Sequence, residues 1–120
     1  AAERPMRGIG LGAFPEAMHA HKSTELTNDW RRAHNSYLEA VAELGWPVAI
    51  LMFIAVTLVF LAALRGVWTR RRLTPIHAAA VSGFVAAAAH GLLDFPLQEP
   101  AICLVLALLL GAAAAQSDRT

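Results

Sequence analysis

Two short stretches of the sequence hold the side chains that a group-transfer reaction needs. Imidazole ionises in the neutral pH range, so a histidine can take the proton of an attacking hydroxyl group, a step that typically contributes about 10² to 10⁴ in rate. Arginine is permanently charged and can hold two phosphate oxygens in its fork, so it suits a departing phosphate group. The candidates are Arg31, Arg32, His34 and Asn35 in the first stretch and His90 and Asp94 in the second.

The first stretch is the candidate reaction centre. Arg31 lies about one helical turn before His34, so the arginine could contact a phosphate while the imidazole faces a hydroxyl group. Asn35 could orient His34 or an acceptor hydroxyl. Arg32 ranks second, because it points toward the polar face of the expected amphipathic helix, which also carries Ser36, Glu39 and Glu43. The alternatives stay open: His34 could simply hydrogen-bond to nearby backbone, the arginines could anchor to lipid headgroups, and Asn35 could be a surface amide.

The second stretch is the pair His90 and Asp94. These residues are spaced i, i+4, so on a continuing helix they share one face and could hydrogen-bond to each other. The pair is a candidate for substrate binding or for positioning the His34 segment. A metal site is not expected, because the His19-Ala20-His21 pair has no carboxylate or cysteine partner nearby and Cys103 is the only cysteine in the sequence.

The elements that must position these residues are apolar helices. Hydrophobic residues make up 57% of the 120-residue chain and charged residues 16%, which argues against an ordinary soluble domain. Charged side chains are absent from residues 44–64, 73–93 and 100–117, and each window is near the roughly 20 residues that cross a hydrocarbon core. The sequence therefore predicts an all-α integral membrane fold with three transmembrane helices.

The orientation follows from the charges of the connecting loops. Four arginines and no acid lie in residues 65–72, so this loop is expected on the cytoplasmic side. Residues 1–45 and 94–100 then share the outer, periplasmic side. The expected organisation is an outer irregular Gly-rich segment 1–28, an outer amphipathic helix 29–45, a span 46–64, a cytoplasmic loop 65–75, a span 76–93, an outer turn 94–100, a span 101–115 and a cytoplasmic tail 116–120.

The composition of the second span indicates that other helices surround it. Ala79, Gly83 and Ala87 recur at four-residue spacing, and small residues so placed let helix backbones approach closely. Three spans are few for enclosing a site, and no start-like segment delivers residues 1–45 to the outer side. We therefore expect the chain to be the C-terminal piece of a larger polytopic protein.

Residues 34–45 resemble the central motif of the O-antigen ligase and O-antigen polymerase superfamily. That motif has His, then Asn, Ser or Gln, nine arbitrary residues and then Gly, and His34, Asn35 and Gly45 match it. The family motif usually continues with Gly, Thr or Tyr three positions after the final Gly, and Val48 departs from this. Residues 8–14 resemble the family's Gly-rich stretch, and residues 90–101 resemble its late outer turn, so the resemblance extends over nearly the whole chain in the same order.

The resemblance implies a metal-independent, inverting glycosyl transfer without a cofactor, on the periplasmic face of a bacterial inner membrane. The donor would be a glycan on a polyprenyl pyrophosphate, and the acceptor a glycan, lipid A-core or protein. His34 would be the base and Arg31 the pyrophosphate contact. Other expected partners are membrane lipids and the remaining helices of the full-length protein, and nothing points to nucleic acid.

Two other classes of protein are compatible with the sequence. One is a non-catalytic membrane component, such as a transporter or flippase segment that binds the same lipid-linked glycan. The other is a small three-span structural subunit that is complete in itself. Only the enzyme needs a titratable base beside its arginines, so a pH dependence of transfer that is lost with His34 would separate it from the transporter segment. Stable, correct insertion of these 120 residues alone would favour the structural subunit.

Overall fold

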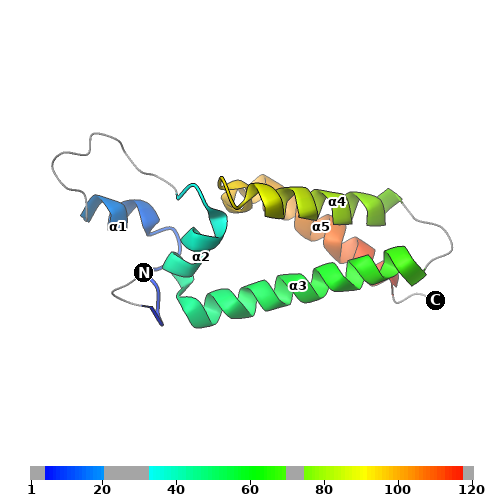
Figure 1. Cartoon of the computed structure of the whole chain (residues 1–120), viewed down its shortest axis with the longest axis horizontal. Coiled ribbons are helices and arrows are strands. Elements are labelled where there is room, and N and C mark those ends of the chain that lie inside the picture. The colour runs from blue at the N-terminus through cyan, green and yellow to red at the C-terminus, as the bar shows by residue number, and fades with distance from the viewer. Residues whose placement is uncertain (1–4, 21–32, 70–74, 118–120) are drawn as a thin grey trace.

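The computed structural model of the chain describes residues 5–20, 33–69 and 75–117, and every regular element within them is helical (Figure 1). The all-α class is as predicted. The elements are α1 (Phe14–Ala20), α2 (Ser36–Leu44), α3 (Trp46–Thr69), α4 (Pro75–His90), the short 3-10 helix η1 (Pro96–Gln98) and α5 (Pro100–Ser117).

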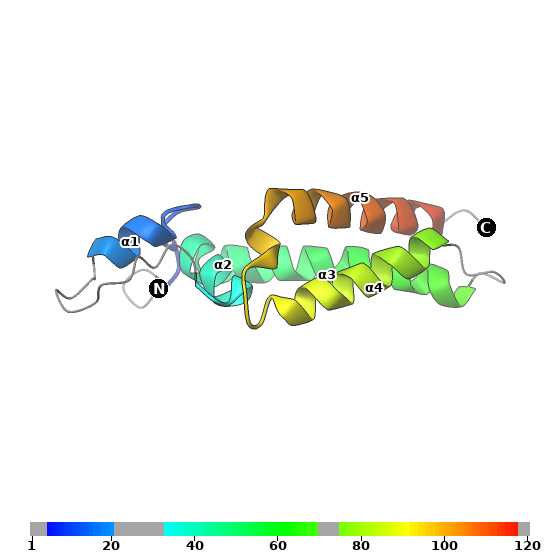
Figure 2. The same cartoon turned by 90° about the horizontal axis from the view of Figure 1, so that it is seen from above.

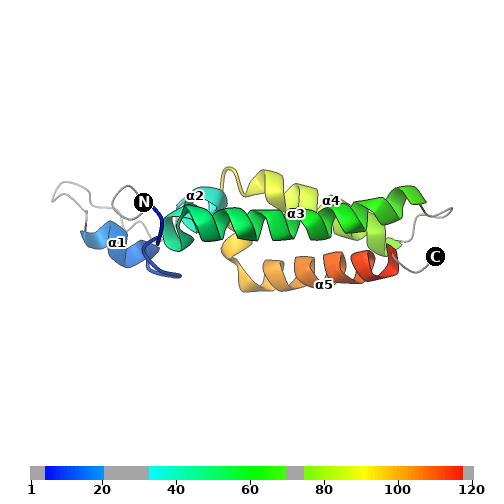
Figure 3. The same ribbon diagram turned by 90° about the horizontal axis from the view of Figure 1, so that it is seen from below.

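Three helices form the body of the molecule. α3, α4 and α5 run side by side along its long axis in alternating directions, and each packs against the other two (Figures 1 and 2). α2 and η1 lie at the end where α3 begins and α4 finishes, and α1 projects beyond them (Figure 3). The molecule is accordingly elongated, 61 × 27 × 17 Å. His34 and Asn35 of the first stretch and His90 and Asp94 of the second therefore belong to the same end of the three-helix body.

Small side chains form the contact between the three helices. The buried cluster consists of Ala63, Ala80, Leu110 and Ala113, with Phe60, Phe84 and Leu109 packed against it. The stripe expected on α4 is therefore only partly correct, because Ala79 is exposed and its neighbour Ala80 faces the other helices. Small residues do bring these helix backbones together, but the contact face is rotated by one residue from the expected one.

Two helices are long and apolar enough to cross a membrane, α3 over Trp46–Trp68 and α5 over Pro100–Ser117. α4 was expected to be a third span over residues 76–93, and this is not confirmed. It has 16 residues and ends at His90, so it is about 24 Å long, less than the roughly 30 Å of a hydrocarbon core.

α4 ends early because its last turn has partners elsewhere. The N–H of Leu92 donates to Ala89 O and that of Leu93 to His90 O, which tightens the chain into a turn. The carbonyl of Gly91 accepts the N–H of Ser36 at 2.8 Å instead of continuing the ladder of α4. Because the N–H groups of Leu92 and Leu93 bond three residues back instead of four, the ladder of α4 stops before residue 93.

Other expected boundaries also need correction. The segment expected to be irregular over residues 1–28 contains the helix α1, and the helix expected over 29–45 begins at Ser36, with residues 29–32 outside the described part. α3 continues past residue 64 to Thr69, so Arg65 is helical rather than in a loop. α5 extends the expected 101–115 helix by one residue at its N-terminus and two at its C-terminus.

Candidate functional site

The helix α2 explains the spacing between the two ends of the matching motif. Asn35 is its N-cap, and its side-chain oxygen accepts the N–H groups of Tyr37 and Leu38, each at 3.0 Å. Gly45 is its C-cap, with φ 75° and ψ 162°. The nine residues between them are the whole of α2, Ser36–Leu44, so the motif defines one short helix with a cap at each end.

The C-terminal end of α2 is held by the Gly-rich segment. Ile9 N donates to Ala42 O and Gly10 N to Glu43 O, both at 3.0 Å. A Cβ atom on Gly8 would overlap the carbonyl oxygen of Glu43, and one on Gly45 would lie 2.8 Å from Gly8 N. Glycine is required at both positions because the two backbones touch.

The N-terminal end of α2 is held by the turn between α4 and α5. The buried Ser36 hydroxyl lies 3.1 Å from Asp94 O and 2.9 Å from Gln98 Oε1, and Gln98 Nε2 donates to Ser36 O at 3.3 Å. Asn35 Nδ2 donates to Leu92 O at 3.0 Å. Hydrogen bonds, most of them to backbone carbonyl groups, therefore join Asn35 and Ser36 to the 91–98 turn, which lies about sixty residues later in the sequence.

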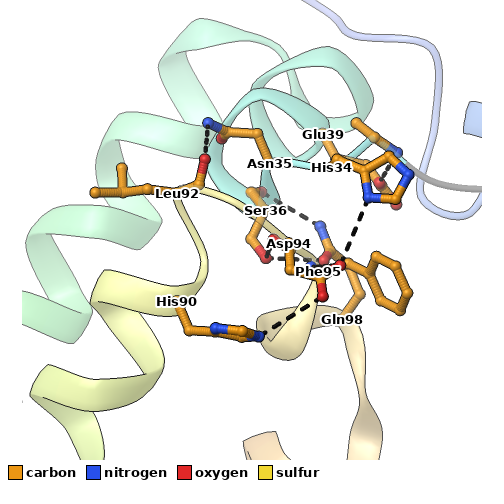
Figure 4. A network of polar contacts seen from close by, with 10 residues as sticks. His34, Asn35, Ser36, Glu39, His90, Leu92, Asp94, Phe95 and Gln98 are labelled. Carbon is orange, nitrogen blue, oxygen red and sulfur yellow. Dashed lines mark hydrogen bonds and ion pairs between the residues drawn. The ribbon is translucent and has the colours of Figure 1, made fainter.

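These contacts bring His34, Asp94 and His90 together in what we call the His-Asp-His cluster (Figure 4). Asp94 Oδ1 lies 3.7 Å from His34 Nδ1, and Asp94 Oδ2 lies 3.6 Å from His90 Nε2. The side chains are 69% exposed for His34, 62% for His90 and 41% for Asp94. Phe95 N donates to Asp94 Oδ1 at 3.0 Å, which helps to fix the carboxylate. The Asp94 carboxylate thus lies between two solvent-accessible imidazole rings, those of His34 and His90.

The cluster forms by a different route from the one expected. His34 lies before the N-cap of α2 and not on a helix face, so its position on a helical wheel no longer applies. His90 and Asp94 are not on one continuing helix, because α4 ends at His90. Asp94 N still donates to His90 O at 3.0 Å, so the turn preserves the i, i+4 spacing that keeps the pair close.

The polar face of α2 is buried, contrary to the sequence-based expectation. Ser36 and Glu39 are each 3% exposed. Glu39 Oε2 accepts Ala33 N at 2.7 Å, and Glu43 Oε1 accepts Phe14 N at 3.2 Å. No role was expected for these two carboxylates. Glu39 lies four residues after the N-cap Asn35, one residue beyond the glutamate position of a capping box, and its side chain likewise reaches back past the start of the helix.

The other candidates lie apart from the cluster or outside the described residues. Arg31, Arg32 and His21 belong to the undescribed range 21–32, so the contacts expected of the two arginines remain predictions. His19 is exposed on α1. In the described ranges, no group of three or more His, Cys, Asp or Glu side chains is arranged to hold a metal ion.

Two side chains without an assigned role lie at other places in the bundle. His77 is fully buried at the opposite end of the three-helix body, where its Nε2 lies 3.4 Å from Ser117 Oγ. Cys103, the only cysteine, is exposed near the start of α5, and its thiol donates to Leu97 O at 3.0 Å. Both contacts join helices or turns, so they account for these side chains as parts of the packing.

Comparison with protein-family models, with curated proteins and with solved structures gave no match. The resemblance to the O-antigen ligase and polymerase superfamily therefore rests on the motif residues alone, and it stays a prediction.

Proposed function

We propose that this chain is the C-terminal part of a membrane glycosyltransferase of the O-antigen ligase or polymerase type, in which His34 is the catalytic base. The observation that carries the proposal is the His-Asp-His cluster. It joins side chains from two separate segments of the resemblance, 34–45 and 90–101, around one carboxylate at the end of the apolar helices.

The exposure of α3 and α5 supports a place in a membrane. A core helix of a soluble protein would be mostly buried, whereas these two helices expose large apolar side chains along their length. Examples are Leu51, Ile54 and Leu58 on α3 and Leu104 and Leu108 on α5. Such surfaces need lipid or neighbouring helices to cover them. The proposal places the cluster on the periplasmic side of a bacterial inner membrane, opposite the arginine-rich connection.

The geometry of His34 suits a base. The Asp94 carboxylate lies 3.7 Å from Nδ1, so this nitrogen faces the carboxylate and Nε2 is left to accept a proton from the acceptor hydroxyl. As the hydroxyl oxygen bonds to the anomeric carbon, the bond from that carbon to the pyrophosphate oxygen breaks and the configuration inverts. The proton moves to Nε2, and Asp94 then stabilises the imidazolium ion.

The remaining candidates have supporting roles in this proposal. Arg31 contacts the departing pyrophosphate, with Arg32 as the second choice, and Asn35 fixes the His34 backbone through its two sets of hydrogen bonds. His90 shares the carboxylate of Asp94 and so influences how strongly that carboxylate acts on His34.

Replacing His34 by alanine in the full-length protein tests the proposal. The assay measures transfer of a radiolabelled glycan from its polyprenyl pyrophosphate to the acceptor. The labelled donor is extracted from membranes of the cells that make the protein. Turnover is expected to fall about 10² to 10⁴-fold in His34→Ala, the typical contribution of a general base. His19→Ala, which removes an exposed histidine on α1, is the matched control and should retain full turnover.

Unchanged turnover in His34→Ala would contradict the base assignment. Donor binding without transfer in the wild-type protein would favour a non-catalytic component, such as a transporter segment. Arg31→Lys keeps the charge but loses the two-pronged fork, so a reduced affinity for the donor is expected. An unaltered donor affinity would show that the pyrophosphate binds elsewhere.

A further inference from the structure

Glu39 is a buried acidic side chain to which the proposed reaction gives no task. Its residue is 3% exposed, on the face of α2 that the amphipathic pattern assigned to water. A carboxylate in such surroundings is costly unless hydrogen bonds satisfy it. Glu39 Oε2 accepts the backbone N–H of Ala33 at 2.7 Å, the length of a strong, charge-assisted hydrogen bond.

The hydrogen bond from Ala33 acts on the residue next to it, His34. Ala33 directly precedes His34, and Asn35 directly follows it. Asn35 is held to the 91–94 turn by its bond to Leu92 O and to α2 as the N-cap. The His34 backbone is therefore anchored on both sides, by Glu39 before it and by Asn35 after it (Figure 4).

The imidazole of His34 depends on this anchoring because few contacts hold the ring itself. The side chain is 69% exposed, with the Asp94 carboxylate at 3.7 Å and the Phe95 ring centroid at 6.1 Å. We propose that Glu39 is a positioning residue for glycosyl transfer, which fixes the segment carrying His34 without touching the substrate. This inference rests on the proposed function of His34.

Loss of the Glu39 oxygen has a specific kinetic consequence. Without its acceptor, the Ala33 N–H must find water, and the start of the His34 segment moves. A displacement of about 1 Å in a catalytic group can lower the rate by about 10². Because Glu39 is buried and acts through the His34 segment rather than on the donor, kcat should fall while KM for the lipid-linked donor changes little.

Three substitutions of Glu39 in the full-length protein, assayed in proteoliposomes with the same radiolabelled donor, test the inference. Glu39→Ala removes the acceptor, and kcat should fall on the order of 10²-fold. Glu39→Gln keeps an acceptor oxygen at the same reach and should retain most of the turnover. Glu39→Asp keeps the charge but is one methylene shorter, so it should be more impaired than Glu39→Gln even if Glu39→Ala fails to fold.

Glu43→Ala is the matched control. Glu43 lies one turn later on α2, and its carboxylate also accepts a backbone N–H, that of Phe14 at 3.2 Å. That bond holds the first residue of α1 and not the segment before His34. The kcat of Glu43→Ala should therefore stay within a few-fold of wild type, and its amide hydrogen exchange over residues 33–35 should not change.

Three results would overturn the role of Glu39: a normal kcat in Glu39→Ala, a Glu39→Asp variant at least as active as Glu39→Gln, or an equal loss in Glu43→Ala. The His34→Ala variant separates this from a failure of the proposed function. If His34→Ala transfers glycan normally, the proposed role of His34 as the base is wrong and the role of Glu39 fails with it. If His34→Ala is inactive and Glu39→Ala is normal, the function stands and only the positioning role is wrong.

Discussion

The contact between the Gly-rich segment and the end of α2 should stabilise the protein, and replacing Gly45 by alanine tests this. Gly45 has φ 75° and ψ 162°, a region that is essentially restricted to glycine. A Cβ atom there would lie 2.8 Å from Gly8 N and from the carbonyl carbon and oxygen of Met6. All three of these atoms belong to the backbone, so no flexible side chain can move aside to relieve the contacts.

The magnitude follows from two terms. An alanine in this backbone conformation costs about 1 to 3 kcal/mol. Displacing the segment that begins at Pro5 endangers three backbone hydrogen bonds, from Ile9 N, from Gly10 N and from Trp46 N to Pro5 O. Each contributes about 0.5 to 1.5 kcal/mol net. If all three are lost, the free energy of unfolding falls by about 2.5 to 7.5 kcal/mol in total.

The assay is thermal unfolding in detergent, combined with amide hydrogen exchange over residues 5–13. Substitutions of two other glycines separate the conformational cost from the cost of the lost hydrogen bonds. Gly12 also has a positive φ, 74°, but a Cβ there meets nothing within 4 Å, so Gly12→Ala should show the conformational cost alone. Gly111 lies within α5, and a Cβ there also meets nothing within 4 Å. Gly111→Ala should be neutral or stabilising by up to about 1 kcal/mol.

The expected order of stability is therefore Gly111→Ala, then Gly12→Ala, then Gly45→Ala, with faster exchange over residues 5–13 only in the last. Equal melting temperatures for Gly12→Ala and Gly45→Ala would show that the close approach of the two backbones contributes nothing. A Gly45→Ala variant as stable as Gly111→Ala would refute the reasoning altogether.

Two further substitutions test the ends of the bundle by thermal unfolding in detergent. In Asn35→Ala, the free energy of unfolding should fall by about 0.5 to 2 kcal/mol from loss of the N-cap, and further from loss of the hydrogen bond to Leu92 O. Asn35→Asp keeps the capping oxygen, so its free energy of unfolding should fall less. An equal fall in the two variants would contradict the capping role. Gly66→Ala would place a Cβ against the buried His77 ring and should cost about 1 to 3 kcal/mol. Gly83→Ala, where a Cβ meets only an ordinary contact at 3.6 Å, is its control, and equal losses would contradict the steric argument.

The long helices could be predicted from the sequence because a general physical rule governs them. Charged side chains are excluded from long apolar helices, so the charge-free windows locate α3 and α5 to within a few residues, apart from the helical extension of α3 to Thr69. Alternation of the three helices also places residues 34 and 94 at the same end. Neither rule depends on which side chains touch, and this is why both work from one sequence.

The details of the cluster could not be predicted because they depend on partners far away in the sequence. The pattern of α2 assigned Ser36 and Glu39 to the solvent side, since polar side chains usually face water. In the structure, Ser36 is instead buried against Asp94 and Gln98, which are 58 and 62 residues away. The early end of α4 has the same origin, because its freed carbonyl group at Gly91 bonds to the start of α2.

The two ends of α2 are held by different kinds of contact, one between backbones and the other from side chains to backbone carbonyl groups. At the C-terminal end, Gly8 and Gly45 allow backbones to touch, and at the N-terminal end, Asn35 and Ser36 bond to the carbonyl groups of the 91–94 turn. A helix fixed at both ends must keep its length, because one inserted residue would rotate its far end by about 100° and move it by about 1.5 Å. The nine residues of α2 between Asn35 and Gly45 therefore have to match the distance between these two anchors. With position determined by backbone contacts, the imidazole of His34 needs no packing of its own, and its side chain stays 69% exposed with the Asp94 carboxylate 3.7 Å from Nδ1.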